Sequence, residues 1–437
     1  MTIRFDGAWS SALAIGDQMR RTGADIIVLR DLIGRVSFIV ANTRSRPLDF
    51  EGSADYLDKL GAFAAPTPII YSDDLFDRDS ILQAADLVVK EAGSDGEGSL
   101  STLERTIVGS DWVRPEEPGR TRRVTLYGFK GGVGRSTATF MLAQHLARQG
   151  SCVLVADLDL ESPGVGALLQ RQEDLPDYGL IDHLVEASVG NAAGLDLVTR
   201  SETAPASGNG EVWVAPASGR PRDGYDYLSK LNRVYLDSPT GEHRFGERID
   251  AALVACEQRV SELSRTPDVV LLDSRAGIHD IAAVAITQLS ELSLLFAGDN
   301  PQTWSGYRLL FSQWQQNLSL EKLDQVRQRL RMVASMVQPN EADRYIERFQ
   351  DHSQECFAET LYDAVGPDDP DDLNAFNFQP RDSSAPHSPL PILFSSDLVG
   401  LDPVDRPDWY ARPLISAAYE RFLSAAADLI GGGSDGA

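Results

Sequence analysis

Short apolar segments alternate with stretches of helical spacing from Val124 onwards. The apolar segments are VTLYGF, CVLVAD, EVWVAP, DVVLLD, SLLFAG, RMVASMV and PILFS. Most are separated by helical patterns, for example over 137–148, 245–263, 279–289 and 304–316. Strands that are apolar on both faces and joined by helices are typical of a parallel sheet covered by helices on both sides. The pattern therefore predicts an α/β fold with a doubly wound, mostly parallel sheet, which binds ligands at the carboxyl ends of its strands.

The residues before this pattern predict a smaller α/β domain, so we divide the chain into domains 1–118 and 119–437. Helical spacing over 9–21 is followed by DIIVLR and RVSFIVA, which a short turn joins into a hairpin. A helix over 54–63, a strand at TPIIY and a helix over 81–90 are expected next. Histidine and cysteine first occur at His145 and Cys152, which excludes thiol nucleophiles and common transition-metal sites from the first domain. We interpret it as a recognition or regulatory module.

A glycine-rich loop follows the first strand of the larger domain. Its glycines are Gly131, Gly132 and Gly134. They permit backbone conformations that are closed to other residues, and they allow several N–H groups to surround one anion. The helix that begins near Ser136 adds free N–H groups and the positive end of its dipole. Ser136 offers a hydroxyl for magnesium, and Thr137 a second oxygen contact. With Lys130 and Arg135 on either side, the loop suits a nucleotide polyphosphate.

The string Lys130-Gly131-Gly132-Val133-Gly134 resembles the deviant Walker A loop of the ParA/MinD family of ATPases, whose signature is a lysine directly before two glycines. A usual phosphate loop would have glycine at Phe129 and lysine at Arg135, and the arginine version KGGVGR resembles a ParA-like branch of bacterial ATPases. The resemblance covers about residues 122–430 and implies ATP and Mg²⁺ as cofactors. It also implies that Lys130 reaches the nucleotide held by the other subunit of a dimer.

Carboxylates follow two of the apolar strands. Asp157 and Asp159 end CVLVADLD, where they suit a metal-bound or attacking water, or alternatively cap the next turn. The resemblance gives Asp159 the role in hydrolysis and Asp157 a supporting contact. It makes DVVLLDSRAGIHD a Walker B strand and second switch, with Asp273 near the metal and the N–H of Gly277 near the γ-phosphate. The predicted metal set is Ser136, Asp159 and Asp273.

Two further positions in the second switch segment leave alternatives open. Arg275 contacts phosphate or a partner, or is simply a surface arginine. His279 fits the start of a helix better than a catalytic base. For adenine, only Asn340 in the stretch after RMVASMV is a candidate, so ATP is assigned mainly by the resemblance.

The leading functional hypothesis is an ATPase that acts as a nucleotide-gated dimerisation switch, with its output through the N-terminal domain or a protein partner. Candidate processes are cargo partition or positioning and a bacterial defence-type system. Arg135 keeps a positive charge and can pair with phosphate, but it is wider than a compact ammonium, so binding should survive better than turnover. The alternative is therefore a nucleotide sensor or scaffold that does not hydrolyse. A related bacterial tyrosine kinase is disfavoured, because the final residues IGGGSDGA hold no tyrosine.

The net charge and the composition limit the kinds of partner and the cellular location that we expect for this protein. A formal net charge of −25 over 437 residues disfavours nonspecific binding to DNA and to anionic membranes. The first residues have no signal-peptide pattern, and no apolar run approaches the length of a membrane span, so we expect a cytoplasmic protein. The three cysteines are too scattered for a disulfide framework.

Overall fold

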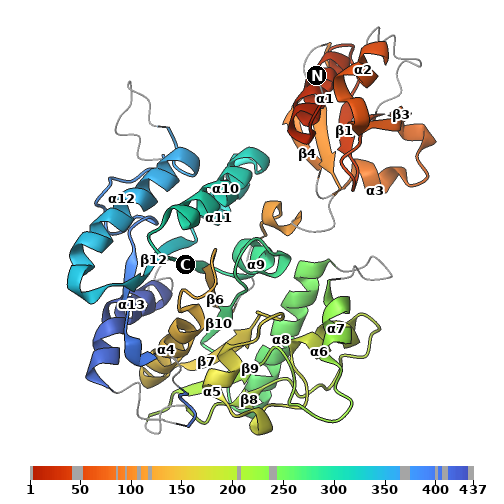
Figure 1. The fold of residues 1–437 in the computed structure, drawn as a ribbon. Coiled ribbons are helices and arrows are strands. Elements are labelled where there is room, and N and C mark those ends of the chain that lie inside the picture. Colours follow the sequence, from red (N-terminus) through yellow and green to blue (C-terminus); the bar gives the residue numbers. More distant parts are fainter. Residues whose placement is uncertain are drawn as a thin grey trace. The chain divides into compact units, whose positions relative to one another are not determined.

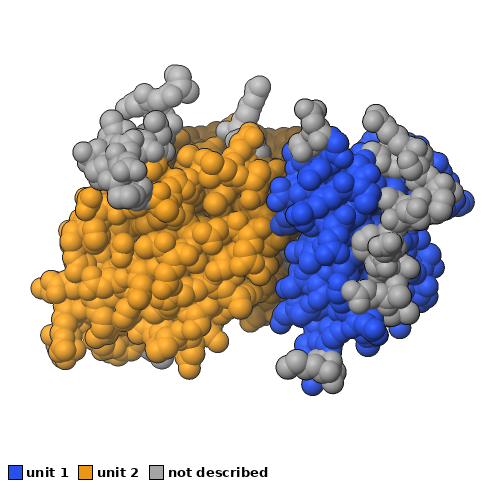
Figure 2. Space-filling model, turned by 90° about the horizontal axis from the view of Figure 1, so that it is seen from above, with its two compact units in different colours: residues 1–110 blue, residues 111–437 orange. Residues whose placement is uncertain are grey.

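The computed structural model describes residues 3–41, 53–84, 87–93, 96–105, 110–116, 121–203, 208–235, 244–364, 375–398, 402–405 and 412–431. The chain divides into two compact units, residues 1–110 and 111–437 (Figure 2). The domain boundary expected between residues 118 and 119 lies outside the described residues. Each unit is described by itself.

Unit 1 is built on a five-stranded mixed sheet in the order β3-β2-β1-β5-β4. Its strands are β1 Ile26–Arg30, β2 Val36–Val40, β3 Ala64–Tyr71, β4 Leu87–Glu91 and β5 Leu100–Glu104. Helices α1 Phe5–Arg20 and α2 Ser53–Leu60 pack on one face of this sheet, where Ile15 and Met19 meet Val28 and Phe38. A smaller apolar cluster around Ile27, Ile39 and Leu103 covers the other face. The unit therefore has a core of its own.

The first hairpin of unit 1 is confirmed, and one predicted helix is wrong. Strands β1 and β2 pair antiparallel, and Asp31 Oδ1 accepts backbone N–H groups of Ile33 and Arg35 at 3.0 and 2.8 Å in the turn. The helix expected over 81–90 does not form, because α3 spans only Arg78–Leu82 and the following Leu87–Glu91 is strand β4. Its valines favour strand, and β4 gains its backbone partners from β5, a strand that the sequence pattern did not reveal.

Unit 2 contains an eight-stranded sheet in the order β13-β12-β11-β6-β10-β7-β9-β8. The strands are β6 Arg123–Gly128, β7 Cys152–Asp157, β8 Thr199–Arg200, β9 Glu211–Ala215, β10 Val269–Asp273, β11 Leu292–Ala297, β12 Leu330–Val337 and β13 Leu390–Leu393. Every neighbouring pair is parallel except β8 with β9. The predicted fold class, a mostly parallel doubly wound sheet in one unit and a smaller N-terminal α/β unit, is confirmed.

Helices cover both faces of this sheet (Figure 1). One face carries α4 Arg135–Arg148, α5 Val165–Leu169 and α13 Pro413–Gly431. The other face carries α6 Leu180–Ala187, α7 Tyr227–Val234, α8 Phe245–Leu263, α9 Asp280–Val284 with the π-turn Ala285–Leu289, α10 Pro301–Asn317, α11 Leu320–Arg327 and α12 Ala342–Thr360. The strands are apolar on both sides because both sides are buried. Among the described residues, no helix is both long and apolar enough to span a membrane.

Candidate functional site

The register of the central strands brings the predicted acidic residues together. Strand β10 lies between β6 and β7, and Asp273 pairs in register with Leu126 on one side and Asp157 on the other. Two hydrogen bonds mark this level: the N–H of Leu158, after β7, donates to Asp273 O at 3.0 Å, and that of Ser274, after β10, donates to Leu126 O at 3.1 Å, while β6 continues to Gly128. The carboxyl ends of three parallel strands thus form one edge, as expected for a ligand site in this architecture.

The glycine loop follows β6 at this edge. Gly132 and Gly134 have φ of 76° and 75°, a region that favours glycine, and Gly134 is the N-cap of α4. A Cβ atom added at Gly131 or Gly132 would meet no heavy atom within 4 Å, so the space next to these two glycines is open. Because the first turn of α4 presents its free N–H groups here, the loop fits a polyphosphate.

Arg135, the first residue of α4, is buried at 9% exposure and joins two carboxylates. Its Nε donates to Asp273 Oδ1 at 2.7 Å, and its Nη2 donates to Asp159 Oδ2 at 3.1 Å. Burial lowers the pKa of Arg135, whereas the charges of Asp273 and, to a smaller extent, Asp159 raise it. The net shift of the Arg135 pKa is upward. Arg135, which stands where a usual phosphate loop has lysine, therefore connects two of the predicted catalytic residues, Asp159 and Asp273.

Asp273 is completely buried and also contacts the proposed magnesium ligand. Ser136 Oγ donates to Asp273 Oδ2 at 2.6 Å, and Thr139 Oγ1 lies 3.4 Å from Oδ1. Oxygen atoms of this kind are what Mg²⁺ prefers. Within the described ranges, no three His, Cys, Asp or Glu residues are grouped to hold a metal ion by themselves. The donor set fits a magnesium ion that takes its remaining oxygens from phosphate and water, because Mg²⁺ is commonly bound by one or two carboxylates in nucleotide sites.

Asp157 and Asp159 both bond to the turn that follows β7. Asp157 accepts N–H groups of Asp159, Gly164 and Gly166 at 3.2, 3.0 and 3.4 Å, and burial together with the nearby Asp273 charge raises its pKa to about 7. Asp159 Oδ1 accepts the N–H of Ser162 at 3.2 Å. Burial raises the pKa of Asp159, Arg135 lowers it and the charge of Asp273 raises it, so that the net shift is upward. Turn capping, the alternative considered from the sequence, is thus present at both residues, while Asp159 also faces Arg135.

Lys130 and Gly277 lie at the margins of this cluster. Lys130 is exposed, and its Nζ is 6.0 Å from the ring centroid of Phe129. Gly277 has φ of 81°, and its N–H donates to Gly128 O at 3.3 Å. Its predicted contact with the γ-phosphate would replace this long hydrogen bond. The roles of both residues remain predictions.

Phe129, which stands where a usual phosphate loop has glycine, is packed against α10. A Cβ atom added to Gly306 of α10 would lie 2.2 to 2.5 Å from three atoms of the Phe129 ring. The ring also lies 6.0 Å from that of Tyr307. Phe129 fits here because Gly306 has no side chain, and no pattern in the sequence indicated this contact.

A hollow of about 110 Å³ lies beside the loop and is mostly apolar. Val133, Thr137, Met336, Phe394, Leu398 and Tyr419 are among its lining residues. Met336 has φ of 58°, rare for a side-chain-bearing residue, and lies where the register of β12 and β13 shifts. Asn340, the adenine candidate, belongs to the 3-10 turn Pro339–Glu341 and does not line the hollow.

Arg275 and His279 meet at Glu161 instead of standing free. Arg275 forms an ion pair with Glu161, His279 Nε2 lies 3.3 Å from Glu161 Oε1, and the Tyr235 hydroxyl donates to the same oxygen. Burial alone would raise the pKa of Glu161, but its bonds to His279, Tyr235 and Arg275 lower it to about 2. His279 is the N-cap of α9, so its predicted place at a helix start is confirmed. Nothing in the sequence pattern singled out Glu161.

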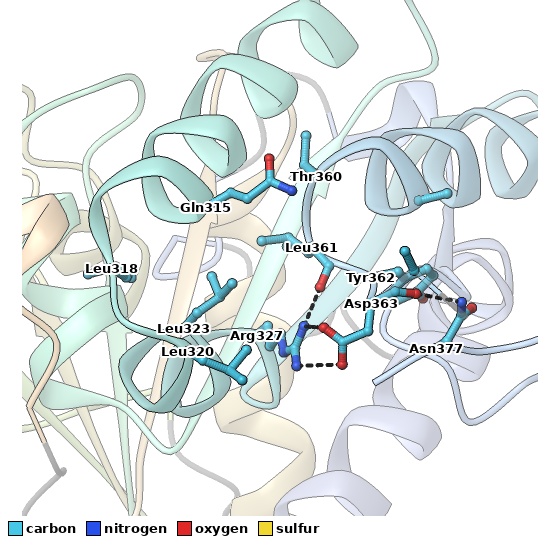
Figure 3. A pocket seen from close by; sticks show the side chains of 12 residues that line it. Gln315, Leu318, Leu320, Leu323, Arg327, Thr360, Leu361, Tyr362, Asp363 and Asn377 are labelled. Atoms are coloured by element: carbon cyan, nitrogen blue, oxygen red, sulfur yellow. Dashed lines mark hydrogen bonds and ion pairs between the residues drawn. The ribbon is translucent and has the colours of Figure 1, made fainter. Parts of the chain in front are cut away.

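A separate cavity of about 680 Å³ lies between α10, α11 and the end of α12 (Figure 3). Arg327 is buried at its wall and forms a two-pronged ion pair with Asp363, with N···O distances of 2.7 and 2.9 Å. The same guanidinium donates to Leu361 O at 2.6 Å and stacks on Phe376. This arrangement joins α11 to the segment after α12, and none of the predicted site residues lines the cavity.

The fold and this edge define a phosphate-loop nucleotide-binding domain. The family model CbiA, described as the CobQ/CobB/MinD/ParA nucleotide binding domain, matches residues 124–365, more than half of the chain. The chain therefore belongs to this family, and the predicted relation to ParA and MinD is confirmed.

Solved structures of the family are similar to the chain at low identity. ParA of pNOB8 is 16% identical, with 70% of this chain and 99% of that chain covered and a TM-score of 0.44. A ParA family ATPase from Chlorobium tepidum is 13% identical, with coverages of 70% and 99% and a TM-score of 0.43. MinD from Pyrococcus horikoshii, solved with Mg-ADP, is 15% identical, with coverages of 72% and 99% and a TM-score of 0.39. A search among curated proteins gave no match.

Proposed function

We propose that the protein is an ATP-binding and ATP-hydrolysing switch. The observation that carries this proposal is the cluster at the loop: Ser136, Arg135 and the two carboxylates of Asp159 and Asp273, joined by hydrogen bonds of 2.6 to 3.1 Å. Two carboxylates against one guanidinium leave negative charge for a magnesium ion, while the open glycine loop and Arg135 attract phosphates. When bound, magnesium would be held on the side of Ser136 and Asp273 and would supply positive charge that stabilises the phosphates.

Each predicted residue has a role in this proposal. Residues 131–137 hold the phosphates, with Ser136 and Asp273 on the magnesium side. Asp159 orients the attacking water, and Asp157 holds the turn that carries Asp159. The N–H of Gly277 faces the γ-phosphate. The apolar hollow beside Val133 and Met336 receives the base, in place of a contact from Asn340.

Steady-state release of phosphate from ATP and magnesium tests the proposal. Asp159→Ala is the first control, because it removes the water-orienting carboxylate and leaves the glycine loop intact. We expect slow release from the wild type and none from the variant, with nucleotide binding retained in both. Equal release from both proteins would exclude the assigned role of Asp159.

ATP-dependent dimerisation is the second part of the proposal. Lys130 is exposed at the loop and free to reach a nucleotide held by a second copy. Light scattering with ATP and magnesium should show a dimer for Asp159→Ala, which traps the bound state, and a monomer when Lys130→Ala is added. A dimer that persists in the double variant would exclude this role of Lys130.

The output of the switch is proposed to pass through the N-terminal domain to a protein partner or cargo. The hairpin between β1 and β2 carries two adjacent exposed apolar side chains, Leu32 and Ile33, which suit a protein contact better than an anionic surface. Net charge disfavours nonspecific DNA as partner. Cargo positioning and a defence-type system both fit such an output, and a cytoplasmic location fits both.

A nucleotide sensor that does not hydrolyse is the second candidate. It is favoured by Arg135, whose planar guanidinium replaces a compact ammonium at the β- and γ-phosphates. Calorimetry that shows tight ATP binding, together with no phosphate release at any protein concentration, would support the sensor over the ATPase.

A further inference from the structure

Glu161 connects three segments that are separate in the sequence. It lies two residues beyond Asp159, and its carboxylate binds Arg275 and His279, which flank Gly277, together with Tyr235 at the end of α7. One side chain therefore links the segment after β7, which carries the water-orienting carboxylate, to the segment after β10, which carries the glycine expected at the γ-phosphate.

The surroundings of Glu161 restrict its movement. Its side chain is 19% exposed. The rings of Tyr235 and His279 pack edge to face with centroids 5.1 Å apart, and Tyr235 packs on Phe245 at 5.4 Å. The Tyr227 hydroxyl donates to the backbone oxygen of Leu160, the residue before Glu161. Helix α7 thus holds this segment at both its backbone and its side chain.

A second connection joins the same two segments on the side of the loop. Arg135 bonds to Asp159 at 3.1 Å and to Asp273 at 2.7 Å. Phosphate oxygens bound in the loop compete for this guanidinium, because Arg135 opens α4 directly after the glycines. In the part of the chain that the structure describes, the partners of Glu161 are Arg275, His279 and Tyr235, which lie outside the loop, so we expect phosphate not to compete for these bonds. After nucleotide binding, we expect the bonds of Glu161 to remain as a side-chain connection between these two segments.

We propose that Glu161 is a positioning residue that couples the two nucleotide-facing segments, with Arg275 as its ion-pair partner. The inference rests on the proposed function and concerns regulation of the same site. Asp159 and Gly277 then take up their nucleotide-bound positions together. ADP contacts only the glycine loop and the hollow, whereas ATP also meets Gly277. Loss of Glu161 should therefore weaken recognition of the γ-phosphate and slow turnover without weakening the binding of ADP.

The test uses the full chain with Glu161→Gln, Arg275→Gln and the double variant. Glu355→Gln is the matched control, since Glu355 pairs with Arg308 at 3.1 Å on α10 and α12, away from the loop. Calorimetry gives the affinity for ADP and for a non-hydrolysable ATP analogue with magnesium, and phosphate release gives kcat and KM. Circular dichroism of the nucleotide-free variants checks that each is folded, and Arg275→Gln carries the test alone if Glu161→Gln does not fold.

We expect the ratio of analogue affinity to ADP affinity to fall about tenfold in either single variant, with kcat reduced to a similar degree and ADP affinity changed less than about twofold, as for residues that orient a ligand-binding group. The double variant should be no worse than the singles, because both remove the same bond. Glu355→Gln should match the wild type.

Three outcomes would overturn the inference. An unchanged affinity ratio and kcat in Glu161→Gln would mean that the two segments move independently. An equal loss of ADP and analogue binding would indicate a general structural role, and additive effects in the double variant would mean that the two residues act separately. The proposed function fails by a different result, a wild-type protein that binds neither nucleotide, which is seen before any variant is compared.

Discussion

The contact between Phe129 and Gly306 gives a prediction whose size follows from the structure. In Gly306→Ala, the new methyl group would lie 2.2 to 2.5 Å from ring atoms of Phe129, whereas ordinary contact begins near 3.4 Å. The ring, which directly precedes Lys130, must therefore retreat by about 1 Å. Overpacking of this kind destabilises by about 1 to 3 kcal/mol. Alanine inside a helix offsets about 1 kcal/mol of this relative to glycine, so a net loss of about 1 kcal/mol is expected.

Two measurements test the effect of Gly306→Ala, one on stability and one on nucleotide affinity. Hydrogen exchange measured by mass spectrometry reports the stability of the two units separately. Affinity for a fluorescent ATP analogue reports the loop and should fall roughly tenfold, since a shift of this size misplaces the groups that bind phosphate. Gly7→Ala in α1 is the control: a methyl group there meets no atom within 4 Å, so this variant should be stabilised by about 0.5 kcal/mol.

Removal of the ring should relieve the clash. Gly306→Ala in the background of Phe129→Ala should lose neither stability nor affinity relative to Phe129→Ala alone, because the atom that obstructs the methyl group is gone. A Gly306→Ala protein that is as stable as the wild type and binds nucleotide normally would refute the proposed contact between α10 and the loop.

The remaining predictions concern charge and burial. Arg135→Ala leaves the carboxylates of Asp159 and Asp273 without their cation and should destabilise unit 2 by about 3 kcal/mol in denaturant unfolding, whereas Arg135→Lys should lose less than half of this. Asp299 is almost fully buried; burial raises its pKa, but bonds from His352, Arg348 and Trp304 lower it below its ordinary value of 3.8, so its stabilisation is present above that pH and is lost as the pH falls below it. Asp299→Asn should therefore flatten the fall of unfolding free energy as the pH drops below 3.8 and through the lowered pKa of Asp299; an unchanged slope in that range would contradict this. Burial raises the pKa of all three cysteines, so a thiol reagent should label Cys152, Cys256 and Cys356 only at the rate of unfolding, and fast labelling of native protein would count against their burial.

The sequence predicts unit 2 well because its strands are buried on both faces and several of its helices, such as α8 and α10, are long. The pattern over 245–263 matches α8 Phe245–Leu263 residue for residue, and all seven apolar segments from VTLYGF to PILFS form strands. Unit 1 is harder, since short apolar runs such as LVVKE fit a helix and an edge strand equally well until the partner strand is known. The polar appearance of LSTLE hid β5, and with it the partner of β4.

The candidate site likewise contains residues that the local sequence marks and residues that only the folded chain brings together. The loop is recognisable from its glycines and flanking charges, whereas Asp159 and Asp273 are assigned from their places after apolar strands and from the family resemblance. Met336, Phe394 and Tyr419 reach the hollow from β12, the end of β13 and α13, so only the folded sheet brings them beside Val133. Glu161 and Gly306 are equally unmarked in the sequence, because their roles depend on single contacts with distant side chains.

The proposed role of the hollow as the site of the base also implies when the protein gains its full nucleotide binding during synthesis. Val133 and Thr137 leave the ribosome early, whereas Phe394 and Tyr419 come from the last tenth or so of the chain. A growing chain can form the glycine loop long before β13 has joined the sheet and α13 has docked beside α4. Nascent chains should therefore hold phosphates only weakly and gain their full nucleotide affinity when the C-terminal helix packs, so that occupancy of the site reports that the fold is complete.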